Sequence, residues 1–323
     1  MPTHGRPRYV VEAVESVLAQ SLGEWRLLVH EDGAGDPAVA AALAPYLEDG
    51  RVSHAASGQR IGAARSMSRL VAAGDAPYVA ILHDDDRWHP GFLERRVRFL
   101  DAHPECGMAF SEHLDIDRDG SPTGRSVPKL DEGLQPHEEF ARRMLAENLV
   151  ATPTVVVRRS AYEAVGPAFD EGFPTLYDWE MMLRLAQGFP AGYLRVWDAE
   201  YRTHGVQTSA AGDRGREFLR LYEHAESMAR RAGPALLPPE EERRRLRAGY
   251  LLSAALDDVG DGRRREAARR VRAALRAYPR SALTRRFAAA ALGVVLPAAG
   301  RRAIASLRAT LYQRRGRPAS PLP

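Results

Sequence analysis

Two short apolar runs, each followed by carboxylates, indicate what kind of fold this chain can adopt. Leu27–Val29 leads into Glu31-Asp32-Gly33, and Tyr78–Leu82 stops at His83-Asp84-Asp85-Asp86. Neither run alternates apolar with polar residues, so both are typical of strands that are buried on two faces. Apolar residues at helical spacing fill the segments around them, at 10–22, 62–73 and 90–103. We therefore predict an α/β fold in which helices flank a mostly parallel sheet.

Ligands of such a sheet bind outside the carboxyl ends of its strands. The turns at Asp32 and at Asp84–Asp86 both follow a strand directly, and so belong to that edge. We expect the first strand to be shortened, because Met1-Pro2-Thr3 already corresponds to the carboxyl end of a strand. Either the true start lies upstream of Met1, which we favour, or the sheet lacks a strand.

The balance of charge changes along the chain. Residues 212–323 include 25 basic and 11 acidic residues, whereas the residues before them include 21 basic and 31 acidic ones. We predict an α/β domain over 1–210, an arginine-rich α-helical C-terminal region over 211–313 and a disordered tail over 314–323. Within the helical region, 243–258 and 263–277 are expected to form an antiparallel helix pair.

Composition excludes several classes of protein. Hydrophobic residues make up 45% of the chain and charged residues 27%, which excludes a wholly disordered protein. The single cysteine, Cys106, excludes a disulfide framework and a multi-cysteine metal cluster. No apolar segment near the N-terminus predicts a signal peptide. The longest apolar stretch, 287–299, is too short to span a bilayer; it predicts a small buried helix or a segment at a membrane surface.

The turn at Asp84–Asp86 is the first candidate for chemistry. Adjacent carboxylates repel one another, and burying them without a cation is costly. Mg²⁺ or Mn²⁺ accepts such oxygen ligands and bridges them to phosphates, whereas a solvated acidic turn is the alternative. Asp32 is interpreted either as an acceptor of hydrogen bonds from a nucleobase or ribose, or as part of an ordinary Asp-Gly turn. Arg65 suits a diphosphate, with a plain surface arginine as the alternative.

A predicted helix over 177–187 opens with Asp178-Trp179-Glu180. The N-terminus of a helix favours an ionised carboxylate, while burial beside Trp179 would raise the basicity of Asp178. An N-cap role for Asp178 and a plain first-turn role for Glu180 are the alternatives.

Seven ordered segments of residues 1–210 resemble family 2 glycosyltransferases. They are Pro2–Pro7 (PTHGRP), 11–21 (VEAVESVLAQS), Trp25–Asp36 (WRLLVHEDGAGD), Gly62–Arg65 (GAAR), Tyr78–Trp88 (YVAILHDDDRW), Tyr177–Leu185 (YDWEMMLRL), and Tyr201–His204 with Thr208-Ser209. Their order makes the resemblance far more specific than any one motif. It implies a GT-A fold, in which a nucleotide-binding α/β sheet carries a metal site, and the transfer of sugars from nucleotide-sugar donors.

The resemblance also assigns roles on the donor side. Pro2, Thr3 and Asp32 would line the nucleoside pocket, Arg65 would approach the nucleotide, and Asp84 would hold the ribose. Asp85 takes the usual position of the ligand to Mn²⁺ or Mg²⁺. This chain departs from the common pattern at His83, where an aspartate often opens the motif.

On the acceptor side, Asp178 matches the catalytic base of the family, and Trp179 and Glu180 are candidates for acceptor contacts. His204 takes a place where some relatives have a further metal or diphosphate contact. A packed loop histidine is the alternative for His204.

These roles imply inverting, metal-dependent glycosyl transfer to an acceptor hydroxyl. The expected partners are a nucleotide-sugar donor and a saccharide or lipid-linked acceptor, in bacterial cell-surface polysaccharide or glycolipid synthesis. The expected location is the cytoplasm, at the inner face of the membrane. A non-catalytic sugar-nucleotide binder or scaffold of the same fold is the alternative: the shortened strand and His83 favour it, whereas Asp85, Asp178 and His204 argue against it.

The last part of the chain is strongly basic. From Arg263 to the end there are 16 basic residues and one acid, Glu266. Such a segment favours contact with an anionic membrane face, with a solvated helical face or a partner-docking module as the alternatives. No nucleic acid is expected, because no aromatic interleaving or recognised module accompanies the charge.

Overall fold

The computed structural model describes residues 1–203 and 214–296. They fall into two compact units, of which the first holds 1–140 and 148–203 and the second holds 141–147 and 214–296. The predicted domain boundaries at 210 and 313, the predicted tail over 314–323, and His204 all lie outside the described residues.

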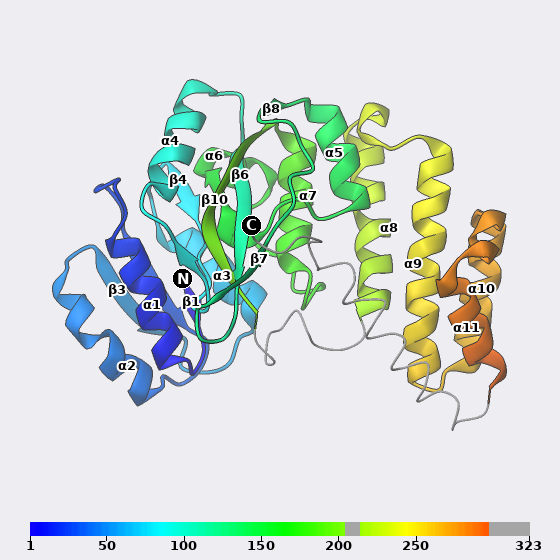
Figure 1. Cartoon of the computed structure of the whole chain (residues 1–323), viewed down its shortest axis with the longest axis horizontal. Coiled ribbons are helices and arrows are strands. Elements are labelled where there is room, and N and C mark those ends of the chain that lie inside the picture. The colour runs from blue at the N-terminus through cyan, green and yellow to red at the C-terminus, as the bar shows by residue number, and fades with distance from the viewer. Residues whose placement is uncertain (204–213, 297–323) are drawn as a thin grey trace. The chain divides into compact units, whose positions relative to one another are not determined.

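The smaller of two sheets in the first unit is parallel throughout (Figure 1). In spatial order it consists of β1 (Pro2–Thr3), β2 (Leu27–Glu31) and β3 (Val52–Ala56). Thr3 pairs with Glu31, and the carbonyl oxygen of Thr3 accepts a hydrogen bond from the Asp32 amide at 3.1 Å. The carboxyl ends of β1 and β2 therefore lie side by side.

Two helices cover this sheet. The first, α1 (Pro7–Leu18), begins at a proline, whose fixed φ suits the first helical position. Its buried valines Val10, Val14 and Val17 recur at helical spacing and share one core with Leu27 and Val29 of β2. The second, α2 (Pro37–Leu43), is capped by the Asp36 carboxylate and continues into the 3-10 helix η1 (Ala44–Glu48).

The larger sheet is mixed. Its spatial order is β4 (Tyr78–Ala80), β9 (Val155–Arg158), β6 (Met108–Ile116), β10 (Ala191–Arg202) and β5 (Arg87–Trp88), with β7 (Pro122–Arg125) on β6 and β8 (Gly133–Gln135) on β10. Its central strands β6 and β10 run parallel, and the other described pairs of this sheet are antiparallel. The α/β fold predicted from the sequence is confirmed, with parallel pairing concentrated in the smaller sheet and the β6–β10 pair.

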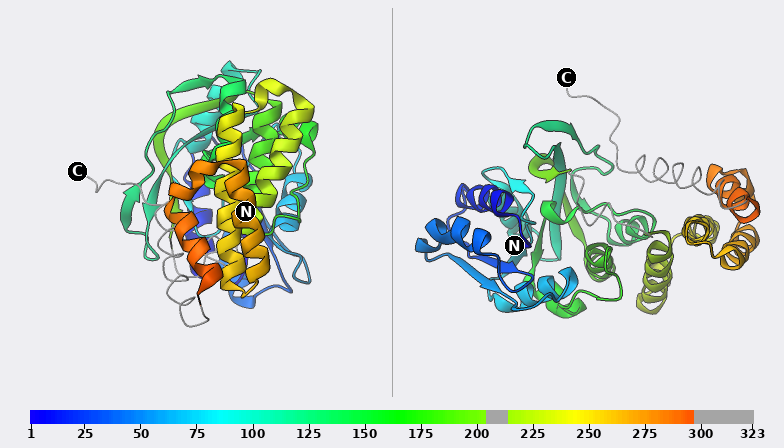
Figure 2. Two further views of the ribbon diagram at one scale, coloured as in Figure 1. Left: turned by 90° about the vertical axis from the view of Figure 1, so that its right-hand side faces the viewer. Right: turned by 90° about the horizontal axis from the view of Figure 1, so that it is seen from below.

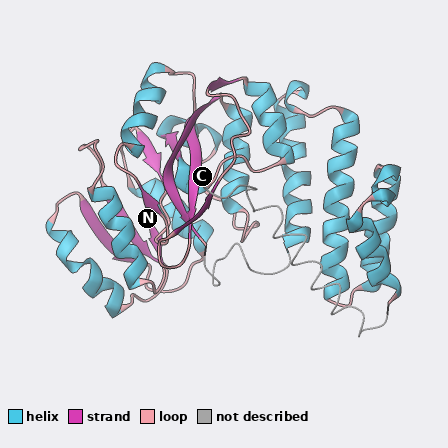
Figure 3. Cartoon of the chain, viewed as in Figure 1, coloured by secondary structure: helices cyan, strands magenta, loops and turns pink. Residues whose placement is uncertain are grey.

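α3 (Ala63–Ala73) contacts β1 and β2 of the smaller sheet. α4 (Phe92–Ala102) and α6 (Arg159–Val165) contact strands of the larger sheet (Figure 3). The chain also forms α5 (His137–Ala146) and α7 (Tyr177–Gly188), with the 3-10 helix η2 (Thr152–Thr154) before β9. The helices predicted at 62–73, 90–103 and 177–187 correspond to α3, α4 and α7. Because α7 begins at Tyr177, the acidic residues that follow it lie in the first turn of a helix.

The second unit is helical, as predicted for the C-terminal region. It contains α8 (Arg214–Ala232), α9 (Glu240–Gly260), α10 (Arg264–Ala277) and α11 (Arg285–Val295), with the 3-10 helices η4 (Pro234–Leu236) and η5 (Pro279–Leu283). The right-hand view of Figure 2 shows these four helices nearly end-on, so their axes are close to parallel or antiparallel. Val259, Val271 and Ala290 belong to one buried cluster that joins α9, α10 and α11.

Most of the apolar stretch 287–299 forms α11. Ala289, Ala290 and Gly293 are buried, whereas Leu292 and Val295 face solvent. Among the described helices, none combines the length and the apolar character that crossing a bilayer requires.

Candidate active site

The acidic turn, which we define as residues 83–86, connects β4 to β5 in the first unit. Its three aspartates are all buried, with exposed fractions of 4% for Asp84, 9% for Asp85 and 2% for Asp86. A solvated turn would leave these side chains open, so that alternative is wrong. Buried carboxylates need cationic or hydrogen-bonding partners, because removing an unpaired charge from water is costly.

Residues in and just after β1 provide some of these partners. The Thr3 hydroxyl donates to Asp84 Oδ2 at 2.7 Å. Arg6 Nη1 lies 2.9 Å from Asp84 Oδ1 and 2.8 Å from Asp85 Oδ2, so one guanidinium bridges both carboxylates. Burial nevertheless outweighs Arg6 and raises the pKa of Asp84. Arg6 is therefore a site residue to which the sequence analysis assigned no role, although it lies within the PTHGRP segment.

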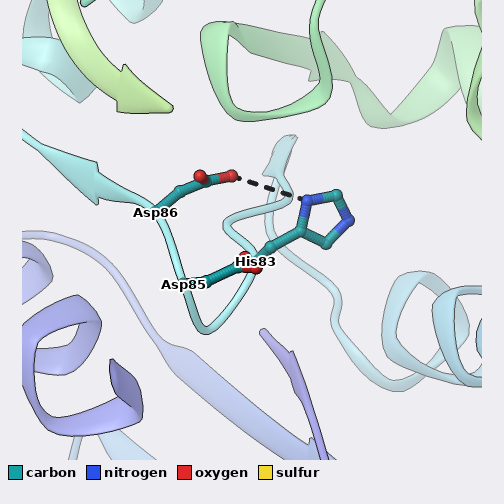
Figure 4. Close-up of side chains that lie close together, drawn as sticks. All are labelled: His83, Asp85 and Asp86. Atoms are coloured by element: carbon teal, nitrogen blue, oxygen red, sulfur yellow. Dashed lines mark ion pairs between the residues drawn. The ribbon is translucent and has the colours of Figure 1, made fainter. Parts of the chain in front are cut away.

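His83, Asp85 and Asp86 together can hold a cation (Figure 4). Each offers one ligand atom, and these atoms lie within 4.8 Å of one another. The Nδ1 atom of His83 lies 3.6 Å from Asp86 Oδ2, a buried oxygen that accepts no hydrogen bond from the described residues. Carboxylate oxygens and an unsatisfied buried acceptor fit Mn²⁺ or Mg²⁺. Asp85, the predicted ligand, belongs to this group, and His83 and Asp86 join it.

The pKa values of His83 and Asp86 are both shifted, because buried charged groups lie close together in the acidic turn. Burial alone would lower the pKa of His83, but the carboxylates of Asp86, Asp85 and Asp178 outweigh burial and raise it. Burial raises the pKa of Asp86, against the influence of His83. A divalent cation at this place would relieve the repulsion between the carboxylates.

Asp178 lies in the first turn of α7. Leu176 occupies the N-cap position, so the alternative interpretation of Asp178 as an N-cap is wrong. The Thr152 hydroxyl donates to Asp178 Oδ2 at 3.1 Å, and the Trp179 amide donates to Asp178 Oδ1 at 2.7 Å. These two hydrogen bonds fix the orientation of the Asp178 carboxylate.

Asp178 and Asp85 of the acidic turn both affect the pKa values of His83 and Tyr177. The charges of Asp178 and Asp85 both raise the pKa of His83 against the effect of burial. Burial raises the pKa of Tyr177 most, and Asp178 and Asp85 raise it further. Asp178, a candidate general base, therefore lies within electrostatic range of the candidate cation site.

Comparison with known proteins identifies the family. The family model described as glycosyl transferase family 2 matches residues 1–166, more than half of the chain. The chain belongs to glycosyl transferase family 2. The resemblance seen in the ordered motifs is thereby confirmed.

Individual proteins agree with this assignment. The uncharacterized protein y4gI of Sinorhizobium fredii is 30% identical over 182 residues, which cover 55% of this chain and 19% of that protein. The putative teichuronic acid biosynthesis glycosyltransferase TuaG of Bacillus subtilis is 26% identical over 203 residues, 62% of this chain and 76% of TuaG. This chain thus spans less than two thirds of the Sinorhizobium relative.

A likeness of fold extends to solved structures. The crystal structure of S. aureus TarS 1–349 in complex with UDP-GlcNAc matches with a TM-score of 0.66 at 13% identity, covering 99% of this chain and 91% of that one. At this identity the likeness shows the fold alone, and it confirms the predicted GT-A fold.

Asp32, predicted to contact the nucleoside of this family's donors, directly follows β2 and is buried. Its carboxylate accepts hydrogen bonds from the backbone amides of Ile61 at 2.6 Å and Gly62 at 3.1 Å. Its carbonyl oxygen lies 2.9 Å from His4 Nδ1, and the His4 amide in turn donates to Asp84 at 3.4 Å. Asp32 and the acidic turn are therefore linked through His4, and the nucleoside role of Asp32 stays a prediction.

Arg65 and Pro2 complete the predicted donor side. Arg65 makes a two-pronged ion pair with Glu171, in which Nε lies 2.9 Å from Oε1 and Nη2 lies 2.8 Å from Oε2. Its side chain is 53% exposed, so a phosphate could replace Glu171 without unfolding the site. Pro2 lies in β1 opposite His30. The nucleotide roles of both residues stay predictions.

The predicted acceptor candidates Trp179 and Glu180 are both buried. Glu180 receives hydrogen bonds from Arg184 Nε at 2.9 Å and from Arg184 Nη2 at 2.8 Å. Arg184 also donates to the carbonyl oxygens of Val165 and Gly166, at 3.1 and 2.6 Å. This gives Glu180 a structural role in α7, and its acceptor role stays a prediction.

Arg202, at the end of β10, is a positioning residue that the sequence analysis did not assign. It is fully buried, and its amide donates to Asp86 Oδ1 at 2.9 Å while its Nε donates to the Asp85 carbonyl at 2.7 Å. Its Nη2 donates to Glu12 of α1 at 2.6 Å. In the sequence, only its place in the Tyr201–His204 motif indicates that Arg202 belongs to the site.

Proposed function

We propose that this chain transfers a glycosyl group, with inversion, from a nucleotide-diphosphate sugar to an acceptor hydroxyl. The observation that carries this proposal is the buried group of His83, Asp85 and Asp86, whose ligand atoms lie within 4.8 Å of one another in a member of glycosyl transferase family 2. A base next to a cation site is what glycosyl transfer from a nucleotide diphosphate needs, because a proton is removed on one side and charge develops on the other.

In this mechanism Asp178 accepts the proton of the acceptor hydroxyl. The hydroxyl oxygen then forms a bond to the anomeric carbon while the bond from that carbon to the diphosphate oxygen breaks. Thr152 holds Asp178 Oδ2, which orients the carboxylate for the transfer. General-base help of this kind contributes roughly 10²- to 10⁴-fold in rate.

Asp85, Asp86 and His83 would hold Mn²⁺ or Mg²⁺, which when bound neutralises charge on the departing nucleotide diphosphate. Arg6 and Thr3 keep the carboxylates of the turn in place. Trp179 and Glu180 would help to form the acceptor side of the site, because they follow Asp178 in the first turn of α7. His204 stays a proposed metal or diphosphate contact from the family pattern.

The relatives support particular donor and product classes for this proposal. The TarS structure contains UDP-GlcNAc, which makes uridine diphosphate sugars the first donors to test. TuaG is named for teichuronic acid biosynthesis, which supports cell-envelope polysaccharide or glycolipid as the product class. The proposed setting is the bacterial cytoplasm, at the inner face of the membrane.

A panel of nucleotide-diphosphate sugars tests this proposal. With Mn²⁺ present, we expect one donor to release its nucleotide diphosphate faster than the others, and EDTA to stop that release. Asp131→Asn, at a fully exposed aspartate, should behave like the unchanged chain. A donor that stabilises the chain against heat without releasing nucleotide diphosphate, even with crude acceptor fractions, would instead support the non-catalytic binder.

A further inference from the structure

The helices of the second unit contain two kinds of arginine. Asp258 of α9 is buried, and its carboxylate lies 3.2 Å from Arg216 of α8, 3.1 Å from Arg263 and 2.7 Å from Arg270 of α10. These arginines join three helices around one buried acid. These arginines pair with Asp258 inside the unit, so we do not count them as charges for binding a partner.

Four other arginines of α10 face solvent, and we call them the arginine stripe: Arg265, Arg269, Arg272 and Arg276. Steps of four, three and four residues place them on one face of the helix. The opposite face carries the buried Ala267, Val271 and Ala274. Among the described ion pairs, only Arg269 of the stripe has an acidic partner, Glu266.

The charge of this surface is strongly one-sided. Residues 264–296 include nine arginines and a single acid, Glu266. In contrast, three exposed arginines of α8 and α9 have acids beside them: Arg230 lies next to Glu226, Arg245 next to Glu242, and Arg247 next to Glu223. The surface of α10 and α11 is therefore the part of the second unit that suits an anionic partner.

Exposed aliphatic side chains accompany this charge. Leu283 is 88% exposed, Val295 78% and Leu292 55%, the three most exposed large apolar side chains among the described residues. They belong to η5 and α11, which pack against α9 and α10 in the same helical cluster. Isolated apolar residues are common on surfaces, but three of this size on elements that pack against the basic helix α10 indicate a partner with both charge and an apolar interior.

We propose that the α10–α11 surface docks this chain on an anionic lipid bilayer. The arginine stripe matches anionic headgroups, and Leu283, Leu292 and Val295 match the acyl region just beneath them. A nucleic-acid duplex would use the arginines but would leave the aliphatic side chains in water. Each arginine near an anionic surface strengthens binding by about fivefold, which corresponds to about 1 kcal/mol. This docking goes beyond glycosyl transfer and does not depend on it.

Sedimentation of the full chain with lipid vesicles tests the proposal. Vesicles of phosphatidylcholine alone are compared with vesicles that also contain phosphatidylglycerol. The stripe variant R265Q/R269Q/R272Q/R276Q is matched by R230Q/R231Q/R245Q/R247Q, which removes the same charge from exposed arginines of α8 and α9. We expect binding to the anionic vesicles only, a loss of more than about tenfold in the stripe variant, and a change within about twofold in the matched variant.

A second variant separates a bilayer from other polyanions. L292S/V295S keeps every arginine, and we expect it to weaken binding to anionic vesicles while leaving binding to duplex DNA unchanged. Equal binding by the stripe variant and its matched control would overturn the proposal, as would no preference for anionic vesicles. Vesicle binding that is insensitive to L292S/V295S and fully displaced by DNA would assign the surface to nucleic acid instead. Circular dichroism of each variant checks that the helices stay folded, and donor turnover is measured separately.

Discussion

Buried Arg202 joins the acidic turn to two other parts of the first unit. Besides its bonds to Asp85, Asp86 and Glu12, its Nη1 donates to the carbonyl oxygens of Asp117 and Arg118 at 3.2 and 3.3 Å. The Arg202 amide donates to Asp86 Oδ1, so the other carboxylate oxygen, Asp86 Oδ2, faces His83. Arg202 thereby orients a proposed metal ligand without being one itself.

Arg202→Lys should weaken binding of the metal more than it destabilises the fold. Lysine keeps the charge but loses the planar fork that reaches several acceptors at once. We expect the Mn²⁺ concentration for half-maximal donor turnover to rise by about 10- to 100-fold, the usual range for a residue that orients a ligand. A titration of turnover against Mn²⁺ measures this.

Arg158→Lys is the matched control for this experiment. Arg158 donates to the carbonyl oxygens of Leu100 at 2.8 Å and Cys106 at 3.2 Å, but to no residue of the acidic turn. Its replacement should lower the melting temperature without shifting the Mn²⁺ requirement. If both variants shift the Mn²⁺ requirement equally, Arg202 has only a structural role.

Cys106, the single cysteine, should report on opening of the first unit. It is 1% exposed, and burial, helped by the charge of Glu105, raises its pKa to about 11. Because the thiolate is the reactive form, iodoacetamide at pH 8 should label the native chain far more slowly than the urea-unfolded chain. Mass spectrometry measures the labelling. Equal rates in the native and the unfolded chain would show that Cys106 is accessible in the native state.

At the scale of elements, helices were easier to predict than strand directions. Spacing of apolar residues identified α3, α4 and α7, because one buried face of a helix leaves a period in the sequence. A strand buried on both faces is a continuous apolar run whichever way its neighbour runs, so β9 beside β6 carries no sign of its antiparallel pairing. The sequence predicts no strand at β10, because its polar residues Asp198 and Glu200 interrupt the apolar pattern.

Asp198 of β10 forms a buried ion pair. Asp198 is 2% exposed and Arg96 of α4 is fully buried, with Arg96 Nη2 2.7 Å from Asp198 Oδ1. Arg95 Nε lies 2.9 Å from Asp198 Oδ2. This cluster ties α4 to the larger sheet, and no pattern in the sequence links residues so far apart.

Asp198→Asn should destabilise the first unit by about 3–5 kcal/mol at pH 7, because Arg96 then stays buried without a counter-charge. All four tryptophans lie in the first unit, so urea unfolding followed by tryptophan fluorescence measures this unit alone. Asp131→Asn, at an exposed position, should change the unfolding free energy by less than about 0.5 kcal/mol. A similar small effect for Asp198→Asn would contradict the account of this cluster.

The same pair predicts a dependence on pH. Burial alone would raise the pKa of Asp198, but its bonds to Arg96 and Arg95 outweigh burial and lower it. A lowered pKa in the folded state stabilises the fold above the unfolded carboxyl pKa of about 3.9, and this contribution is lost as pH falls through the folded value. Below about pH 4, the unfolding free energies of Asp198→Asn and the unchanged chain should therefore converge.

At the scale of the whole molecule, the first unit assembles a site from segments that are distant in sequence. Asp85 and Asp178 could be predicted because each stands at the end of a strand or the start of a helix within a family motif. The ligand set around Asp85 could not: His83 and Asp86 depend on how the turn folds, and Arg6 bridges Asp84 and Asp85 only because β1 and the turn are adjacent.

The central claim is that Asp178 and the cation site form one active site with separable roles. Calorimetry of nucleotide-diphosphate binding, with and without Mn²⁺, combined with donor turnover in Asp178→Asn and Asp85→Asn, tests it most directly. We predict that Asp178→Asn loses at least about 10²-fold in turnover but keeps Mn²⁺-dependent binding, whereas Asp85→Asn loses the Mn²⁺-dependent part of binding. Unchanged turnover in Asp178→Asn, or unchanged Mn²⁺-dependent binding in Asp85→Asn, would contradict the account.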